Sequence, residues 1–272
     1  MKKLLLLGGA DIQISAIEKG IELGYHVVTC DYLPDNPGHK ISNEYFNVST
    51  TDREAILALA SSLQIDGISA YASDPAAITA AYVSDRLGLP GHPLESVLQL
   101  SNKCEFRKSQ HEIGIPAPEF STIETSHDVI EMARRFQHGI IVKPADTSGS
   151  KGVFRVDVHS GLNSDIDFID SMLDEGMAYS RMKILMAEEY IPREGFLMSG
   201  DVLIDSGRIE FMSFGDVHFN GRINGIVPRS ISLPASKPDE FIQRVEVDLQ
   251  KLVDRFDLSS GVINVDVIET ND

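Results

Sequence analysis

The sequence predicts a parallel α/β domain at the N-terminus, followed by a region in which strands and helices no longer alternate. Over residues 1–100, short apolar runs of strand length alternate with segments of helical spacing, which is typical of a doubly wound parallel sheet. Beyond residue 100, several strands follow one another directly, which indicates an α+β arrangement. The composition, 42% hydrophobic and 24% charged over 272 residues, is that of a globular protein with a sizeable core.

The first hundred residues contain three strand–helix pairs. Ile14, Ile17 and Ile21 share one helical face, and Gly24 ends that helix. The run Thr51-Asp-Arg-Glu has the pattern of a capped helix start. In chain order we expect strands at 3–7, 26–30 and 67–72, and helices at 13–23, 55–63 and 76–87.

The remaining residues alternate less regularly. A single long helix is expected at 94–114, because its apolar residues have helical spacing and a proline-containing stretch ends it. Further helices are expected at 127–136, 166–178 and 238–256. Strands are expected at 120–123, 184–190, 196–204, 208–218 and 262–268, with a hairpin at 140–156. The polar segment 216–230 is expected to be the end of a strand followed by a loop.

Charge and cysteine content exclude several classes of protein. The net charge of −17 argues against nucleic acid as a general partner, because a phosphate backbone requires a basic face. Cys30 and Cys104 form neither a CxxC pair nor a zinc-spaced cluster, and two such thiols are typical of a reducing compartment. The apolar run that follows Lys3 is too short for a signal peptide or a membrane span. We therefore expect a cytoplasmic protein with no membrane partner.

The hairpin at 140–156 is the most informative segment. An apolar run ends on Lys143, a proline follows, and a loop rich in glycine and serine precedes the second strand. Such a loop can fold its N–H groups over a polyphosphate while the lysine meets the charge. A strand and not a helix follows Gly152, so this is not the P-loop pattern. The alternative is an ordinary glycine-containing turn.

Four pieces of sequence occur in a defined order. Lys103 comes first, then the hairpin, then the run Glu188-Glu189-Tyr190-Ile191, and finally Asn264 and Asp266 in the last expected strand. This order resembles the ATP-grasp superfamily of carboxylate–amine ligases, which includes biotin carboxylase and carbamoyl-phosphate synthase. The resemblance covers nearly the whole chain. It implies an N-terminal Rossmann-like domain at 1–100, a central subdomain at 101–180 and an incomplete C-terminal subdomain at 181–272.

The resemblance implies roles for the two lysines and the loop. Lys103 and Lys143 would meet the α- and β-phosphates of ATP as point charges. Taken alone, Lys103 would be an exposed lysine at a helix end. The loop would close over the β- and γ-phosphates through its N–H groups, and its residues are Ser148, Gly149, Ser150, Lys151 and Gly152. Lys151 adds a charge there or points to solvent.

The run after the hairpin would read the base and the ribose. In the family, a carboxylate here accepts from the adenine amino group, and the backbone near Glu189 and Ile191 reads the ring edge. A strand-end acidic pair is the alternative for this run. The family's next glycine is displaced here to Gly195, so we expect Glu194 to contact the ribose hydroxyls.

The last strand and the polar segment before it would supply the metal and substrate contacts. Asp266 aligns with the family's first magnesium ligand, and Asn264 lies two residues earlier on the same strand face. A solvent-facing aspartate is the alternative. Arg222 or Arg229 would bind a substrate carboxylate, unless both are ordinary surface arginines.

One departure from the family matters. The family continues with a strand that carries Glu-x-Asn-Pro-Arg, and these 272 residues end at Thr270-Asn271-Asp272 before it. We therefore expect weak nucleotide binding and little turnover from the chain by itself.

The resemblance implies an ATP- and Mg²⁺-dependent ligase, with small-molecule carboxylate and amine substrates and a homodimeric assembly. ATP would convert a carboxylate to an acyl-phosphate, and an amine would then displace phosphate. Two alternatives stay open. One is a nucleotide-binding module without catalysis. The other is an NAD(P)-dependent Rossmann enzyme that uses Gly8-Gly9 and Asp31, although the full glycine motif is absent.

Overall fold

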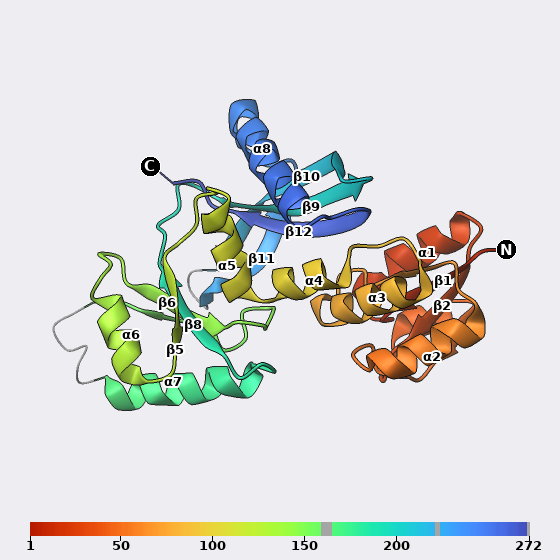
Figure 1. Ribbon diagram of the computed structural model, residues 1–272, viewed down its shortest axis with the longest axis horizontal. Helices are drawn as coiled ribbons and strands as arrows, with labels where there is room; N and C mark the ends of the chain where they lie inside the picture. Colours follow the sequence, from red (N-terminus) through yellow and green to blue (C-terminus); the bar gives the residue numbers. More distant parts are fainter. Residues whose placement is uncertain (159–164, 221–223, 271–272) are drawn as a thin grey trace. The chain divides into compact units, whose positions relative to one another are not determined.

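The computed structural model describes residues 1–158, 165–220 and 224–270 (Figure 1). The chain forms two compact units, one of Met1–Ser101 with Asp257–Gly261 and the other of Asn102–Phe256 with Val262–Asp272. Among the helices of the described residues, none combines the length and the apolar character that crossing a bilayer requires.

The first unit is built on a parallel sheet in the order β3-β2-β1-β4. Its strands are β1 (Lys3–Leu7), β2 (His26–Cys30), β3 (Glu44–Phe46) and β4 (Gly67–Ser69). The central strands are apolar on both faces because both faces are covered. On one face Leu6 and Val27 pack with Ile17 of α1 (Ile14–Glu22), and on the other Leu5 and Val28 pack with Ile56 of α2 (Arg53–Leu63). The predicted doubly wound arrangement is therefore confirmed.

Shorter elements and helix ends complete this unit. Helix α2 begins after Asp52, whose carboxylate accepts from the Ala55 N–H at 3.1 Å. Helix α3 (Asp74–Leu87) ends at Gly88, which has a φ of 64°. The other elements are the 3₁₀ turns η1 (Asp11–Gln13) and η2 (Pro37–Lys40), and helix α4 (Leu94–Ser101). Strand β3 was not predicted because it has only three residues, and β4 is shorter than the predicted 67–72.

The long helix predicted at 94–114 is wrong, because the structure divides it into α4 and α5 (Lys103–Glu112). Asn102 interrupts the helix with an extended backbone, φ −103° and ψ 108°. Its side chain accepts from the Cys104 N–H at 3.0 Å and caps the second helix. Lys103 is therefore the first residue of a new helix rather than part of a continuous one.

The second unit begins with an antiparallel sheet in the order β5-β8-β6-β7. Its strands are β5 (Phe120–Ile123), β6 (Ile140–Pro144), β7 (Phe154–Val156) and β8 (Leu185–Glu189). Strand β8, which the sequence assigned to the last segment of the chain, thus pairs with the sheet of the middle segment. Helices α6 (Ser126–Ala133) and α7 (Ile166–Tyr179) lie along one face of this sheet (Figure 1).

Side-chain alternation gives the two faces of this sheet different characters. Val142 and Ala187 point into the core beneath α6 and α7. Lys143, Met186 and Glu188 point to the opposite face, because neighbouring residues of a strand alternate. Helix α5 packs on that opposite face, where the Cys104 Sγ lies 4.0 Å from the Met186 Sδ.

A second sheet in this unit has the order β11-β10-β9-β12. Its strands are β9 (Leu197–Asp205), β10 (Arg208–Asn220), β11 (Asn224–Ser232) and β12 (Gly261–Val267). The loop predicted around residues 228–230 is wrong, because these residues belong to β11, which pairs antiparallel with β10. Helix α8 (Asp239–Arg255) lies along one face of the sheet and buries Val245 and Leu249 there (Figure 1).

Candidate functional site

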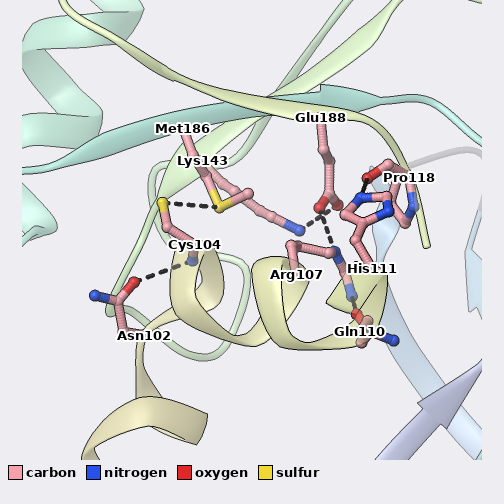
Figure 2. A network of polar contacts seen from close by, with 9 residues as sticks. All are labelled: Asn102, Cys104, Arg107, Gln110, His111, Pro118, Lys143, Met186 and Glu188. Atoms are coloured by element: carbon pink, nitrogen blue, oxygen red, sulfur yellow. Dashed lines mark hydrogen bonds and ion pairs between the residues drawn. The ribbon is translucent and has the colours of Figure 1, made fainter. Parts of the chain in front are cut away.

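A network of charged side chains lies between α5 and the sheet β5-β8-β6-β7, here called the central sheet (Figure 2). Glu188 is buried at the end of β8 and accepts from two cations. The Lys143 Nζ donates to its Oε1, and the Arg107 Nε donates to its Oε2 at 3.0 Å. Arg107 also donates through Nη1 to the Gln110 Oε1 at 2.7 Å. One carboxylate therefore joins a strand lysine to a helix arginine.

The charges in this network depend on one another. Burial alone raises the pKa of the Glu188 carboxyl, but Lys143 and Arg107 outweigh it and hold that pKa below its ordinary value. Burial also lowers the pKa of the Lys143 amine, and the charge of Glu188 opposes part of that effect. Glu188 is therefore an ionised carboxylate, which accepts hydrogen bonds and donates none.

Lys103 lies at the base of the hairpin. As the first residue of α5, it donates its backbone N–H to the Ala145 carbonyl at 2.8 Å. Its Nζ donates to the Thr147 carbonyl at 2.6 Å. The structure thus directs Lys103 to the start of the loop whose preceding strand carries Lys143. Lys103 and Lys143, forty residues apart in sequence, therefore both lie near the start of this loop.

The loop between β6 and β7 has a fixed base and an open tip. At the base, the Asp146 carboxylate accepts from the Arg181 and Met182 N–H groups, at 2.9 and 2.8 Å. Gly152 has a φ of 66°, and a Cβ built there would lie 2.8 Å from the Gly176 Cα of α7. Gly149 has a φ of 71°, yet a Cβ there would meet nothing within 4 Å. Gly152 therefore packs against a helix, whereas Gly149 lies in open space.

The tip consists of Ser148, Gly149, Ser150 and Lys151. Ser150 and Gly149 both have positive φ values, 56° and 71°, so successive residues adopt the left-handed conformation. Lys151 is exposed. A backbone of this kind is suited to fold over an anion with its N–H groups.

The backbone after β8 is tied to neighbouring segments. The Glu189 N–H donates to the Glu119 carbonyl at 2.9 Å, and the Tyr190 N–H donates to the Gly139 carbonyl at 3.1 Å. The Arg155 guanidinium lies 3.8 Å from the centroid of the Tyr190 ring. Ile191 follows, half-buried. The strand end is thus rigid at the position where the sequence predicted base contacts.

Glu194 lies further along this segment, with its side chain exposed. Its N–H donates to the Glu269 carbonyl at 2.8 Å, and its carbonyl accepts from the Lys237 Nζ at 3.0 Å. Lys237 is buried and also pairs with the Glu269 carboxylate at 2.7 Å. These contacts fasten the backbone around Glu194, and no pattern in the sequence indicated Lys237.

The second sheet carries exposed polar side chains on its strand β12. Asn264 and Asp266 are exposed on β12, and Val265 between them is half-buried. The Asn264 Nδ2 donates to the Gly200 carbonyl and to the Asp201 Oδ1, both at 3.0 Å. Both neighbours are acceptors, so the amide nitrogen must face them and the Oδ1 of Asn264 is left as an acceptor. Asp201 was missed in the sequence, although it lies in an alternating exposed pattern on β9.

Asp266 and the amide oxygen of Asn264 fit magnesium by donor type, because this cation prefers oxygen ligands. Within the described part of the chain, no group of three or more His, Cys, Asp or Glu side chains converges as a metal cluster. Of the two predicted arginines, Arg229 is exposed on β11 and Arg222 lies outside the described residues.

The glycines after β1 do not form an open dinucleotide loop. A Cβ built at Gly9 would clash with the His39 imidazole, and the Gly9 carbonyl accepts from the Gly38 N–H at 2.7 Å. Asp31 accepts locally, from the Leu33 N–H at 3.1 Å and the Asn36 Nδ2 at 3.2 Å. The turn at Pro37–Lys40 therefore occupies the space in front of Gly9, which argues against the NAD(P) alternative.

The chain combines a parallel α/β unit, an antiparallel sheet with a lysine-bearing hairpin, and a second sheet, and this agrees with the ATP-grasp fold that the sequence resemblance implies. No protein-family model matches the chain. Solved structures of this fold superpose on 98% to 100% of its length. The biotin carboxylase domain of a Hydrogenobacter thermophilus 2-oxoglutarate carboxylase, solved with MgADP and bicarbonate, has a TM-score of 0.79 and 17% identity, and covers 98% of this chain. An L-amino acid ligase from Bacillus licheniformis has a TM-score of 0.76 and 18% identity, and covers 100%.

A curated relative is also similar in sequence. The formate-dependent phosphoribosylglycinamide formyltransferase of Burkholderia mallei is 27% identical over 157 residues, 55% of this chain. The match spans 38% of that enzyme, and the chain covers 61% and 64% of the two solved structures. The chain therefore spans less than half of the curated relative that it matches.

Proposed function

We propose that this chain is the nucleotide-binding part of an ATP-dependent carboxylate–amine ligase. The observation that carries the proposal is the buried Lys143–Glu188–Arg107 network beside an anchored hairpin loop, within an ATP-grasp fold. Apolar side chains in place of a buried ion network often give equal or greater stability, so such a network is weak evidence for a purely structural role. The position of Glu188 at the strand end suits a contact to the adenine amino group.

In this proposal, each group has one task. Lys103 and Lys143 neutralise the α- and β-phosphates, and the tip Ser148–Lys151 covers the β- and γ-phosphates. Glu188 accepts from the adenine amino group, and Ile191 supplies the backbone contact, because the N–H groups of Glu189 and Tyr190 have partners. Glu194 contacts the ribose. Catalysis would rest on positioning and charge neutralisation.

Asp266 and Asn264 would hold Mg²⁺ through their oxygen atoms. When bound, the ion would supply positive charge that neutralises negative charge on the phosphates during phosphoryl transfer. Asp201 would set the orientation of the Asn264 amide through the hydrogen bond at 3.0 Å.

The substrates would be a small carboxylic acid and an amine. The acid would first become an acyl-phosphate, and the amine would then displace phosphate, which leaves an amide and ADP. Arg229, with Arg222, would bind a substrate carboxylate in this scheme. The free thiols of Cys30 and Cys104 support a reducing, cytoplasmic setting. Assembly as a homodimer stays a prediction from the resemblance.

Ligand-dependent thermal stability tests the proposal. A ligand at about 100 times its Kd stabilises a folded protein by about 2.7 kcal/mol. ATP with Mg²⁺ is expected to raise the melting temperature of the 272-residue chain, whereas NAD⁺ and NADP⁺ are expected to leave it unchanged. An unchanged melting temperature with ATP at millimolar concentration would contradict the proposal. ADP release with panels of acids and amines, measured on the full-length protein, then separates a ligase from a module that only binds nucleotide.

A further inference from the structure

The pairing with Glu188 opposes the binding of a nucleotide phosphate by Lys143. Lys143 is paired with the Glu188 Oε1, and the two side chains are only 13% and 10% exposed. If Lys143 turns to a phosphate, it withdraws its charge from a buried carboxylate. Leaving such a carboxylate without a partner costs several kcal/mol, which would weaken nucleotide binding.

Arg107 supplies a partner that does not have to move. It donates to the Oε2 of Glu188, whereas Lys143 uses the Oε1, so the two cations do not compete for one oxygen (Figure 2). Arg107 is itself held by the Oε1 of Gln110 at 2.7 Å, and Gln110 is buried. A guanidinium stays charged at any pH that the protein tolerates. Arg107 therefore remains with Glu188 whatever Lys143 does.

Helix α5 places this arginine by its own geometry. Arg107 follows Lys103 by four residues, so the two side chains share one helix face, about one turn apart. Lys103 reaches the loop at Thr147, and Arg107 reaches the end of β8 at Glu188. A single helix thereby contacts both the phosphate side and the base side of the proposed site.

We infer that Arg107 is a positioning residue that keeps Glu188 paired and ionised when Lys143 turns to the nucleotide phosphates. This inference rests on the proposed function. The release of Lys143 frees the Oε1 of Glu188 for the adenine amino group, while the Oε2 stays with Arg107. A carboxylate held ionised can only accept, so it favours the amino group of adenine over the carbonyl oxygen of guanine. Selection of ATP over GTP therefore depends on Arg107.

Calorimetric titration of the whole chain with ATP, GTP and inorganic tripolyphosphate, each with Mg²⁺, tests the inference. Arg107→Met is expected to weaken ATP by about tenfold or more, which corresponds to about 1.4 kcal/mol. Tripolyphosphate binding is expected to change much less, and the preference for ATP over GTP to shrink. Arg107→Lys should retain part of that preference. Lys108→Met is the matched control, because Lys108 is exposed on the same helix and its change removes the same charge.

Arg107→Gln covers the case in which Arg107→Met does not fold, because its amide can still donate to the Glu188 carboxylate and Lys143 keeps its anion. It removes the positive charge of Arg107, so it should fold and still prefer ATP less than the wild type does. Equal losses of ATP and tripolyphosphate affinity in Arg107→Met would overturn the inference. An Arg107→Met variant that binds ATP as tightly as the wild type does would overturn it too. Failure of the wild-type chain to bind ATP would instead overturn the proposed function itself.

Discussion

Two sheet faces of the second unit hold their polar side chains in opposite ways. On the central sheet, Lys143 and Glu188 lie beneath α5, buried and joined to Arg107. On the other sheet, Asn264 and Asp266 are exposed on the outermost strand, and Asn264 donates to Asp201 and to a carbonyl. The face proposed to read the base is thus fixed by the fold, whereas the face proposed to bind the metal relies on short-range contacts among exposed groups. Changes on the first face should affect folding, and changes on the second should affect binding alone.

Paired alanine substitutions test this contrast most strongly. Glu188→Ala leaves two partly buried cations without their anion and is expected to lower the free energy of unfolding by about 3 kcal/mol. Asp266→Ala removes an exposed carboxylate and should change it by less than about 0.5 kcal/mol. Chemical denaturation of both variants measures the difference, with Glu189→Ala as a control next to Glu188. Similar losses for Glu188→Ala and Asp266→Ala would show that the two faces do not differ as described.

The pH dependence of stability sharpens the same contrast. The folded-state pKa of Glu188 lies below the ordinary value of 4.5, because Lys143 and Arg107 outweigh the effect of burial. Its ionised form therefore stabilises the fold fully above about pH 4.5, and this contribution is lost as the pH falls through the folded-state pKa. The stability difference between wild type and Glu188→Gln should accordingly shrink in acid. A difference that stays constant from pH 6 down to the acid unfolding transition would contradict this account.

Part of this architecture could be read from periodicity alone. Apolar spacing located the helices and strands because each buries one face, and strand alternation puts Lys143 and Glu188 on the same side of their sheet. The fold class and the resemblance followed from that order. The break at Asn102 was missed, because the apolar spacing continues through it and only the cap geometry ends the helix.

The remaining partners could not be predicted, because they meet across long sequence separations. Arg107 contacts a residue 81 positions away, and Asp201 contacts one 63 positions away. Neither belongs to a short motif, and each would have passed as an ordinary surface charge. The placement of His39 against Gly9 likewise depends on how the turn at Pro37–Lys40 folds back. Pairing between distant elements, and not local propensity, decides which charges are functional candidates.

On the exposed face, Asp266→Asn should separate metal binding from folding. The variant keeps the shape of the side chain and removes its charge, so the stability of the ligand-free protein should not change measurably. Without Mg²⁺, its thermal shift with ATP should equal that of wild type. The additional shift caused by Mg²⁺ should require about tenfold more of the cation. An unchanged Mg²⁺ titration would remove Asp266 from the proposed metal site.

Asp201→Asn should give the smallest effect, and it tests orientation rather than ligation. The aspartate can only accept, so it forces the Asn264 amide to present its nitrogen and to leave its Oδ1 as a ligand. An asparagine at this position can donate instead, so the amide of Asn264 is free to turn over. We expect a loss of about threefold in apparent Mg²⁺ affinity, at or below the lower end of the usual range for residues that orient a metal ligand. Asp205→Asn, four residues along the same face of β9, is the matched control. If both variants weaken Mg²⁺ equally, the effect is one of general charge and Asp201 has no orienting role.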